Sequence, residues 1–228
     1  PLDSVTPDNF FFTENDLAAY AVKHYNFTTH EGFNAGIWRN DNATDNQAAT
    51  DYDKKWIPGQ WKVPEAYDNP ASNDPWYFSA IREANYFLET VVPRFEKGEI
   101  EGSETNIKHY IGEMYFLRAK NYLSKLETFG DFPIIKNTLP DESASLIQAS
   151  KREPRHKVAR FILEDLDLAI GLLTNTISGG KNRITQNAAL LLKSRAALYE
   201  ASWLTYHKGT ALVPGGPGWP GKAEDIAD

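Results

Sequence analysis

Apolar residues recur every three or four positions along five segments of the chain, the spacing of one face of an α-helix. The segments span residues 13–25, 75–93, 103–128, 154–173 and 185–206. Between the first two lies a long stretch, residues 26–75, that is rich in Asn, Asp, Gly, Thr and aromatic residues and shows no such period. The pattern predicts a mostly α protein with one long irregular loop.

Residues with known positional preferences mark the ends of several of these helices. Thr13, with an acidic residue three positions later, and Thr185 are expected N-caps. Gly130 followed by Pro133 predicts the end of the third helix.

The second helix has less regular boundary signals. Asp74 and Pro75 predict its start, because aspartate is a good N-cap and proline suits the first turn. Pro93 predicts a stop or a kink.

Two helical segments repeat one another. The pattern Arg-Ala-x-x-Tyr occurs at residues 118–122 and again at 195–199, 77 residues later. The same offset aligns Gly112 with Ala189, Met114 with Leu191 and Leu126 with Trp203. Small residues fall on small ones and large apolar residues on large ones. The repeat predicts tetratricopeptide-like stacked helical hairpins with long loop excursions, the hairpins covering residues 75–128 and 154–207.

Composition excludes several classes of function. A formal net charge of -7 with no basic stretch argues against a general nucleic-acid binder. The absence of cysteine excludes disulfides, thiolate metal sites and cysteine nucleophiles. No run of 18 apolar residues occurs, so no membrane-spanning helix is expected.

Candidate catalytic or metal-binding sets are weak. The five histidines show no metal-ligand spacing, and we expect His109 at a helix surface. Glu164, Asp165 and Asp167 lie on a helix whose other face is apolar, which favours a solvated charged face over a glycosidase pair. No catalytic residue, metal or cofactor is therefore predicted.

The irregular loop carries the residues most suited to recognition. Flat aromatic rings stack on the C–H faces of sugars, while amides and carboxylates bond to pairs of hydroxyls. The candidate ligand-binding residues are Trp38, Asp41, Asn42, Asp45 and Trp61. Alternatively, the aromatic residues anchor the loop to the helices. A Ca²⁺ loop is disfavoured because Ala43 occupies a ligand position.

Residues 112–135, with Arg-Ala-x-x-Tyr followed by Phe-Gly-Asp-Phe-Pro, resemble the signature helix and turn of SusD/RagB-type proteins. Residues 2–7, 81–88 and 188–206 agree with the same family in the same order. The turn at residues 129–131 matches a scaffold element of the family and is expected to be structural. The loop around Asp41 to Asp45 matches a loop near the family's ligand face.

The resemblance implies a surface-exposed outer-membrane lipoprotein of the Bacteroidetes type. Such a protein binds oligosaccharide or polysaccharide without catalysis and delivers it to a SusC-like TonB-dependent transporter. Family members are longer, so we expect this chain to be the N-terminal portion, with the lipid-bearing cysteine before Pro1 and the rest of the site after the chain. Two alternatives stay open: a tetratricopeptide-type module that binds a protein, and an α-helical glycosidase.

Overall fold

The computed structural model describes residues 10–25, 27, 57–58, 76–176, 182–213 and 215–218. The chain divides into two units, Pro1–His24 with Tyr67–Asp228, and Tyr25–Ala66. The helices described all belong to the first unit: α1 (Glu14–Lys23), α3 (Ser79–Glu96), α4 (Glu104–Phe129), α5 (Ser143–Ala149), α6 (Arg155–Leu172) and α7 (Gln186–Tyr206).

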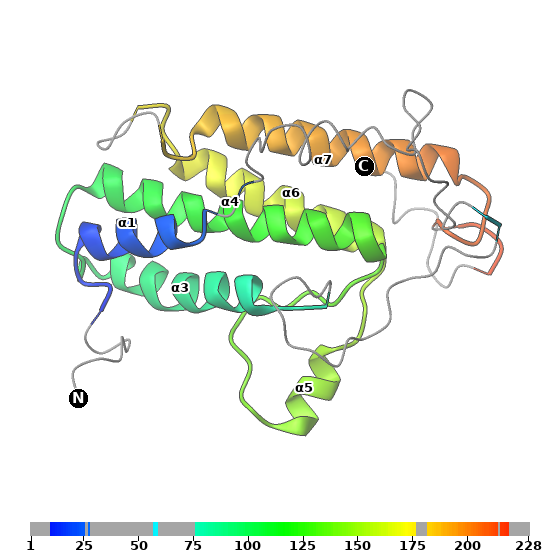
Figure 1. Ribbon diagram of the computed structural model, residues 1–228, viewed down its shortest axis with the longest axis horizontal. Coiled ribbons are helices and arrows are strands. Elements are labelled where there is room, and N and C mark those ends of the chain that lie inside the picture. Colours follow the sequence, from blue (N-terminus) through cyan, green and yellow to red (C-terminus); the bar gives the residue numbers. More distant parts are fainter. Residues whose placement is uncertain are drawn as a thin grey trace. The chain divides into compact units, whose positions relative to one another are not determined.

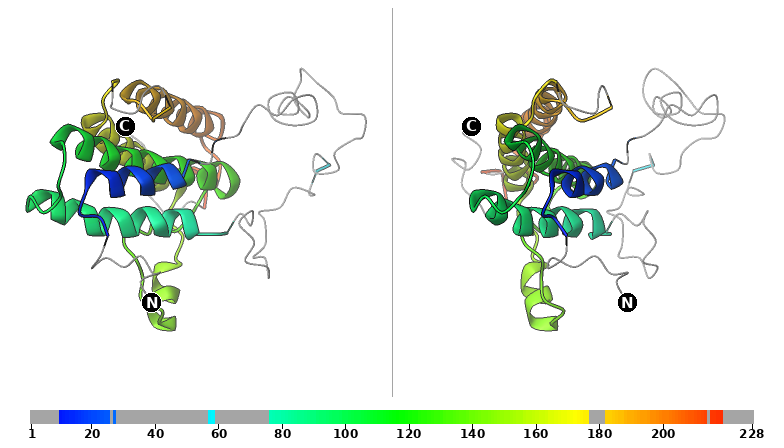
Figure 2. Two further views of the ribbon diagram at one scale, coloured as in Figure 1. Left: turned by 60° about the vertical axis from the view of Figure 1, so that its left-hand side comes forward. Right: turned by 90° about the vertical axis from the view of Figure 1, so that its left-hand side faces the viewer.

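Five of these helices lie side by side, as the views in Figures 1 and 2 agree. α3 packs on α4, α4 on α6 and α6 on α7, while α1 lies against α4. Helices α3 with α4, and α6 with α7, are the two hairpins that the repeat predicts. The predicted fold class, mostly α with stacked helical hairpins, is confirmed.

Helix α4 lies at the centre of this arrangement and contributes the largest share of the core. Its buried apolar residues include Ile111, Met114, Leu117, Tyr122 and Leu126. They are buried all round the helix because α1, α3 and α6 each cover part of it.

The capping predictions at three helix ends are confirmed. The Thr13 hydroxyl accepts a bond from the Asp16 amide (3.3 Å), and the Asp16 carboxylate accepts one from the Thr13 amide (3.0 Å), completing a capping box. Thr185 accepts from the Ala188 amide at 3.3 Å. Gly130 ends α4 with a φ of 71°, which a residue with a side chain rarely adopts.

The predicted start of α3 is wrong. The helix begins at Ser79, and Asp74 and Pro75 lie outside the described residues. Ring packing accounts for the late start, because Trp76 and Phe78 stack on Phe132 at centroid distances of 5.7 and 5.0 Å before the helix begins.

At its other end, α3 runs through Pro93 to Glu96. The proline removes one amide donor, but its carbonyl still accepts from the Lys97 amide at 3.2 Å. The last turn therefore closes without a break.

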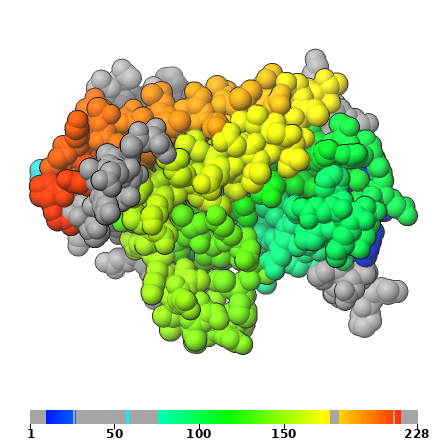
Figure 3. Space-filling model, turned by 180° about the vertical axis from the view of Figure 1, so that it is seen from behind, coloured from blue at the N-terminus to red at the C-terminus, as the bar shows by residue number. Residues whose placement is uncertain are grey.

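Helix α5 was not expected from the sequence. It is seven residues long, and none of its residues is buried, so it has no apolar stripe for a pattern search to find. Figure 3 shows it projecting from the body of the other helices.

Candidate functional site

The ligand-binding residues expected from the sequence are not among the described residues. Trp38, Asp41, Asn42, Asp45 and Trp61 all lie within residues 28–56 or 59–75, outside that part of the chain. Their assignment stays a prediction. The structure does show how the helices behind the loop use their own polar groups.

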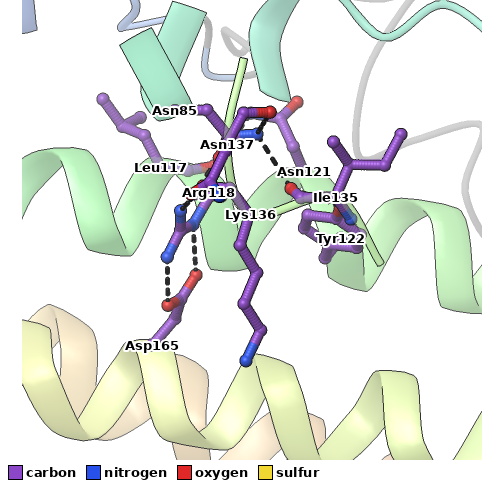
Figure 4. Close-up of polar contacts among 9 residues, drawn as sticks. All are labelled: Asn85, Leu117, Arg118, Asn121, Tyr122, Ile135, Lys136, Asn137 and Asp165. Atoms are coloured by element: carbon purple, nitrogen blue, oxygen red, sulfur yellow. Dashed lines mark hydrogen bonds and ion pairs between the residues drawn. The ribbon is translucent and has the colours of Figure 1, made fainter. Parts of the chain in front are cut away.

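A buried network centred on Arg118 joins α3, α4, α6 and the linker between α4 and α6 (Figure 4). Arg118 donates to both carboxylate oxygens of Asp165, with Nε–Oδ2 and Nη2–Oδ1 distances of 2.7 Å. Its Nη1 also donates to the side-chain oxygen of Asn85 (2.9 Å) and to the Lys136 carbonyl (3.3 Å). The planar guanidinium thus donates hydrogen bonds to α6, α3 and the linker at once.

Asn85 and Tyr122 extend this network by hydrogen bonds to the backbone of the linker. The Asn85 amide donates to the carbonyls of Ile135 (2.8 Å) and Asn137 (3.3 Å). The Tyr122 hydroxyl donates to the Ile135 carbonyl (3.2 Å) and accepts from the Ile135 amide (2.8 Å). Each polar group here has a partner inside the protein, so the network holds the scaffold together and offers no group to a ligand.

Burial shifts the pKa of two members of the network. Burial raises the pKa of Asp165, and the hydrogen bonds and charge of Arg118 oppose that rise. Burial also raises the pKa of Tyr122 to about 12, with the backbone hydrogen bond to Ile135 opposing it. Tyr122 is therefore a neutral hydroxyl at physiological pH.

The expected solvent exposure of Asp165 and His109 is wrong. Asp165 is 2% exposed because it faces Arg118 across the α4–α6 contact. It follows Val158 by seven residues and so lies on the apolar face of α6, a spacing that the sequence already contained. His109 is fully buried, and its Nδ1 accepts a hydrogen bond from the Thr174 amide at 3.2 Å.

The Phe-Gly-Asp turn is a structural element, as the resemblance implied. The Asp131 carboxylate accepts a hydrogen bond from the amide of Arg155, the first residue of α6, at 2.9 Å. The Arg155 side chain then pairs with the buried Glu200 of α7 (Nη2–Oε2, 2.8 Å) and lies 3.8 Å from the centre of the Trp203 ring. One turn thus links the end of α4 to both helices of the second hairpin.

A third ion pair, with a buried carboxylate and a partly buried arginine, ties α1 to the stack. Glu113 of α4 accepts two hydrogen bonds from Arg183, at 2.9 and 2.5 Å. Arg183 also donates to the carbonyl of Ala18 in α1 at 3.3 Å. Arg183, which precedes α7, therefore connects the second hairpin to both α4 and α1.

A cavity of about 390 Å³ lies between α3, the linker and α5. Its walls are mainly apolar and include Trp76, Phe78, Ile81 and Leu146. Asn85 also lines it, but its amide and carbonyl oxygen are already bonded within the scaffold. A hollow with mainly apolar walls, whose Asn85 is already bonded, fits an apolar group better than a sugar hydroxyl.

Metal binding and membrane spanning both lack support in the described residues. No group of three or more His, Asp or Glu there is placed to hold a metal ion. None of the helices described is long and apolar enough to cross a membrane. The described helices thus form a repeat scaffold whose buried charges hold its own elements together.

Comparison with known sequences identifies the scaffold. Residues 3–198 match the SusD-like family described as "Starch-binding associating with outer membrane". The match covers most of the chain, so the protein belongs to the SusD-like family.

Individual proteins are similar to parts of this chain. "SusD-like protein P2" of Formosa agariphila is 26% identical over 208 residues, which cover 89% of this chain and 38% of that protein. A SusD-like protein of Bacteroides fragilis is similar in structure (TM-score 0.45, 28% identity), over 54% of this chain and 22% of that chain. A laminarin-binding SusD-like protein has a TM-score of 0.43 and 23% identity, over 58% and 28% of the two chains. This chain spans well under half the length of each relative.

Proposed function

We propose that the full-length protein is a non-catalytic outer-membrane lipoprotein, exposed at the cell surface. It would bind an oligosaccharide or polysaccharide and deliver it to a SusC-like TonB-dependent transporter. The observation that carries the proposal is the match of residues 3–198 to a family described as starch-binding and associated with the outer membrane. The lipid anchor would lie outside the 228 residues.

Recognition is assigned to the loop before α3, through Trp38, Asp41, Asn42, Asp45 and Trp61. The internal bonding of the helices supports this assignment. Arg118, Asp165 and Asn85 are bonded to one another or to the linker, and so cannot also serve hydroxyls of a glycan. The loop remains the part of the sequence with aromatic rings, amides and carboxylates close together.

Two of the three carboxylates named on α6, Asp165 and Asp167, are paired within the protein, which favours a binding role over hydrolysis. A glycosidase needs one carboxyl group that donates a proton and a second that acts as base or nucleophile. Asp165 has both oxygens bonded to Arg118, and Asp167 pairs with Lys193 of α7 at the surface. Neither is arranged as a proton donor to a ligand.

Affinity gel electrophoresis of the full-length protein tests the proposal. We expect retardation by at least one polysaccharide in a panel of starch, laminarin, xylan and mannan, with no release of reducing ends on prolonged incubation. Release of reducing sugar would instead support the glycosidase alternative. No retardation, together with a protein that co-purifies without sugar, would support the protein-binding alternative.

A further inference from the structure

The cavity between α3, the linker and α5 has the size of a small-molecule site. Its volume of about 390 Å³ lies within the usual range for such sites, which is roughly 300–1,000 Å³. Most of the described residues that line it are apolar, and none of these lining residues is Asp or Glu. Its lining therefore favours a ligand with an apolar body and brings no negative charge from the described residues.

Two aromatic rings form a wall of the cavity that is already ordered. Trp76 and Phe78 both line it, and both rings stack on Phe132, with interplanar angles of 19° and 14°. Phe132 is fully buried, so it holds the two rings in place before a ligand binds. Ordered aromatic faces suit a flat apolar group that can stack on them.

Arg82 of α3 supplies a positive charge to this apolar cavity. Its side chain is exposed at the cavity wall and forms no ion pair within the described part of the chain. The nearby carboxylates of α3 are engaged elsewhere. Glu83 lies 3.3 Å from the His24 ring nitrogen, and Glu89 accepts hydrogen bonds from the amide and hydroxyl of Thr138. The Arg82 guanidinium is thus available to an anion.

Two further side chains add to the positive and donating character of the cavity. The Arg152 guanidinium, which likewise has no ion pair among the described residues, lies 4.7 Å from the centre of the Trp76 ring. Asn137 lines the cavity and is exposed, so its side-chain amide can donate to an anion. A carboxylate carried on an apolar body complements both the charge and the walls.

We infer that this cavity binds a small molecule with a flat apolar body and one carboxylate. The apolar body lies against Trp76, Phe78 and Leu146, and the carboxylate accepts hydrogen bonds from Arg82. A sugar suits the cavity poorly, because its hydroxyls would lose water against mainly apolar walls. None of these residues belongs to the set assigned to glycan, so binding of the acid does not depend on the proposed function.

Equilibrium dialysis of the full-length protein against trans-cinnamate tests the inference, with cinnamamide as a neutral analogue of similar shape. We expect cinnamate to bind with a Kd on the order of 100 µM, and cinnamamide at least ~10-fold more weakly. Arg82→Met should weaken cinnamate binding at least ~10-fold and leave cinnamamide binding unchanged. Lys97→Met removes a positive charge just after α3 and outside the cavity, and should change neither.

Leu146 and Ile147 provide a matched pair for the apolar wall on α5, a helix in which no residue is buried. Leu146 lines the cavity, whereas Ile147 is 69% exposed and does not. Leu146→Asn should weaken the binding of both cinnamate and cinnamamide at least ~5-fold, through the loss of apolar contact. Ile147→Asn should bind both as the parent does, and neither variant should shift the unfolding temperature.

Three results would overturn the inference. If cinnamate does not bind to the full-length protein, the cavity is closed or filled there by other parts of the chain. Equal binding of cinnamate and cinnamamide, or undiminished cinnamate binding by Arg82→Met, would remove the carboxylate from the recognition. Binding that Leu146→Asn leaves unchanged would place the ligand outside this cavity. A protein that binds polysaccharide but not cinnamate would leave the proposed function intact.

Discussion

Arg118 of α4 and Asp165 of α6 form a two-bond ion pair that is almost fully buried, with 6% and 2% of the residues exposed. The pair joins the first hairpin to the second. Taking both charges out of water is costly, and the bonds that Nη1 of the guanidinium makes to Asn85 and Lys136 help to offset the cost. The geometry of the stack therefore depends on both members being present.

We predict that Arg118→Met destabilises the full-length protein by about 3–5 kcal/mol, since it leaves the Asp165 charge and the Asn85 oxygen buried without their donor. Urea unfolding followed by circular dichroism measures the loss. The double variant Arg118→Met with Asp165→Leu is expected to recover much of it, because no charge is then buried.

The exposed pair between Lys193 and Asp167 provides the control. Lys193→Met is expected to cost less than about 1 kcal/mol, because water screens an exposed ion pair. Equal losses at Arg118 and Lys193 would contradict the proposed role of the buried pair.

Tyr122→Phe is predicted to cost about 1–2 kcal/mol at pH 8, through the loss of two hydrogen bonds to Ile135. The difference in free energy of unfolding between the parent protein and the variant should become smaller as pH rises from 10 to 12. In that window the unfolded chain has lost the phenol proton while the folded protein, in which the pKa of Tyr122 is about 12, retains it. The parent's free energy of unfolding therefore falls as pH rises, because the Tyr122 phenol ionises in the unfolded chain. The phenylalanine variant has no such group and no such fall.

Urea unfolding of both proteins at pH 8 and pH 11 measures this change. Lysines and the other tyrosines titrate in both proteins, so their contributions cancel in the difference. A gap of the same size at the two pH values would show that the Tyr122 pKa is not raised.

Gly112→Ala is predicted to destabilise the α4–α6 contact by about 1–3 kcal/mol. An added Cβ would lie 3.0 Å from Leu173 Cγ and 3.1 Å from Leu172 Cβ, closer than packed carbons approach. Gly171, in α6, is the matched control, because nothing lies within 4 Å of its Cβ position. Gly171→Ala should stabilise by up to about 1 kcal/mol through helix propensity, and thermal unfolding of the two variants should shift in opposite directions.

The sequence predicted the helices best where local chemistry decides the outcome. The cap at Thr13 and the stop at Gly130 depend on neighbouring residues, and both predictions were confirmed. The start of α3 was missed because ring packing between Trp76 and Phe132, 56 residues apart, determines it. Long-range contacts of this kind have no signal in a local pattern.

The contrast between local and long-range determinants also holds for polar residues. Asp165 was assigned to a solvated face although its spacing from Val158 places it on the apolar side of α6. Its partner Arg118 lies on another helix, and no local pattern pairs the two. The repeat likewise aligned Arg118 with Arg195 without showing that the first is buried and the second exposed.

The central claim is that the loop preceding α3 binds glycan through a defined set of side chains. Isothermal titration of the full-length protein with a polysaccharide retained in the affinity gel tests it most directly. Trp61→Ala and Asp41→Ala are compared with Trp56→Ala and Asp51→Ala, which change the same residue types in the same loop outside the proposed set.

We expect Trp61→Ala to weaken binding at least ~10-fold, in keeping with about 1–3 kcal/mol for a stacked aromatic ring. Asp41→Ala should weaken it by a comparable factor, while the two controls bind as the parent does and all four variants keep the parent's unfolding temperature. Unchanged affinity in both Trp61→Ala and Asp41→Ala would contradict the assignment of recognition to these residues.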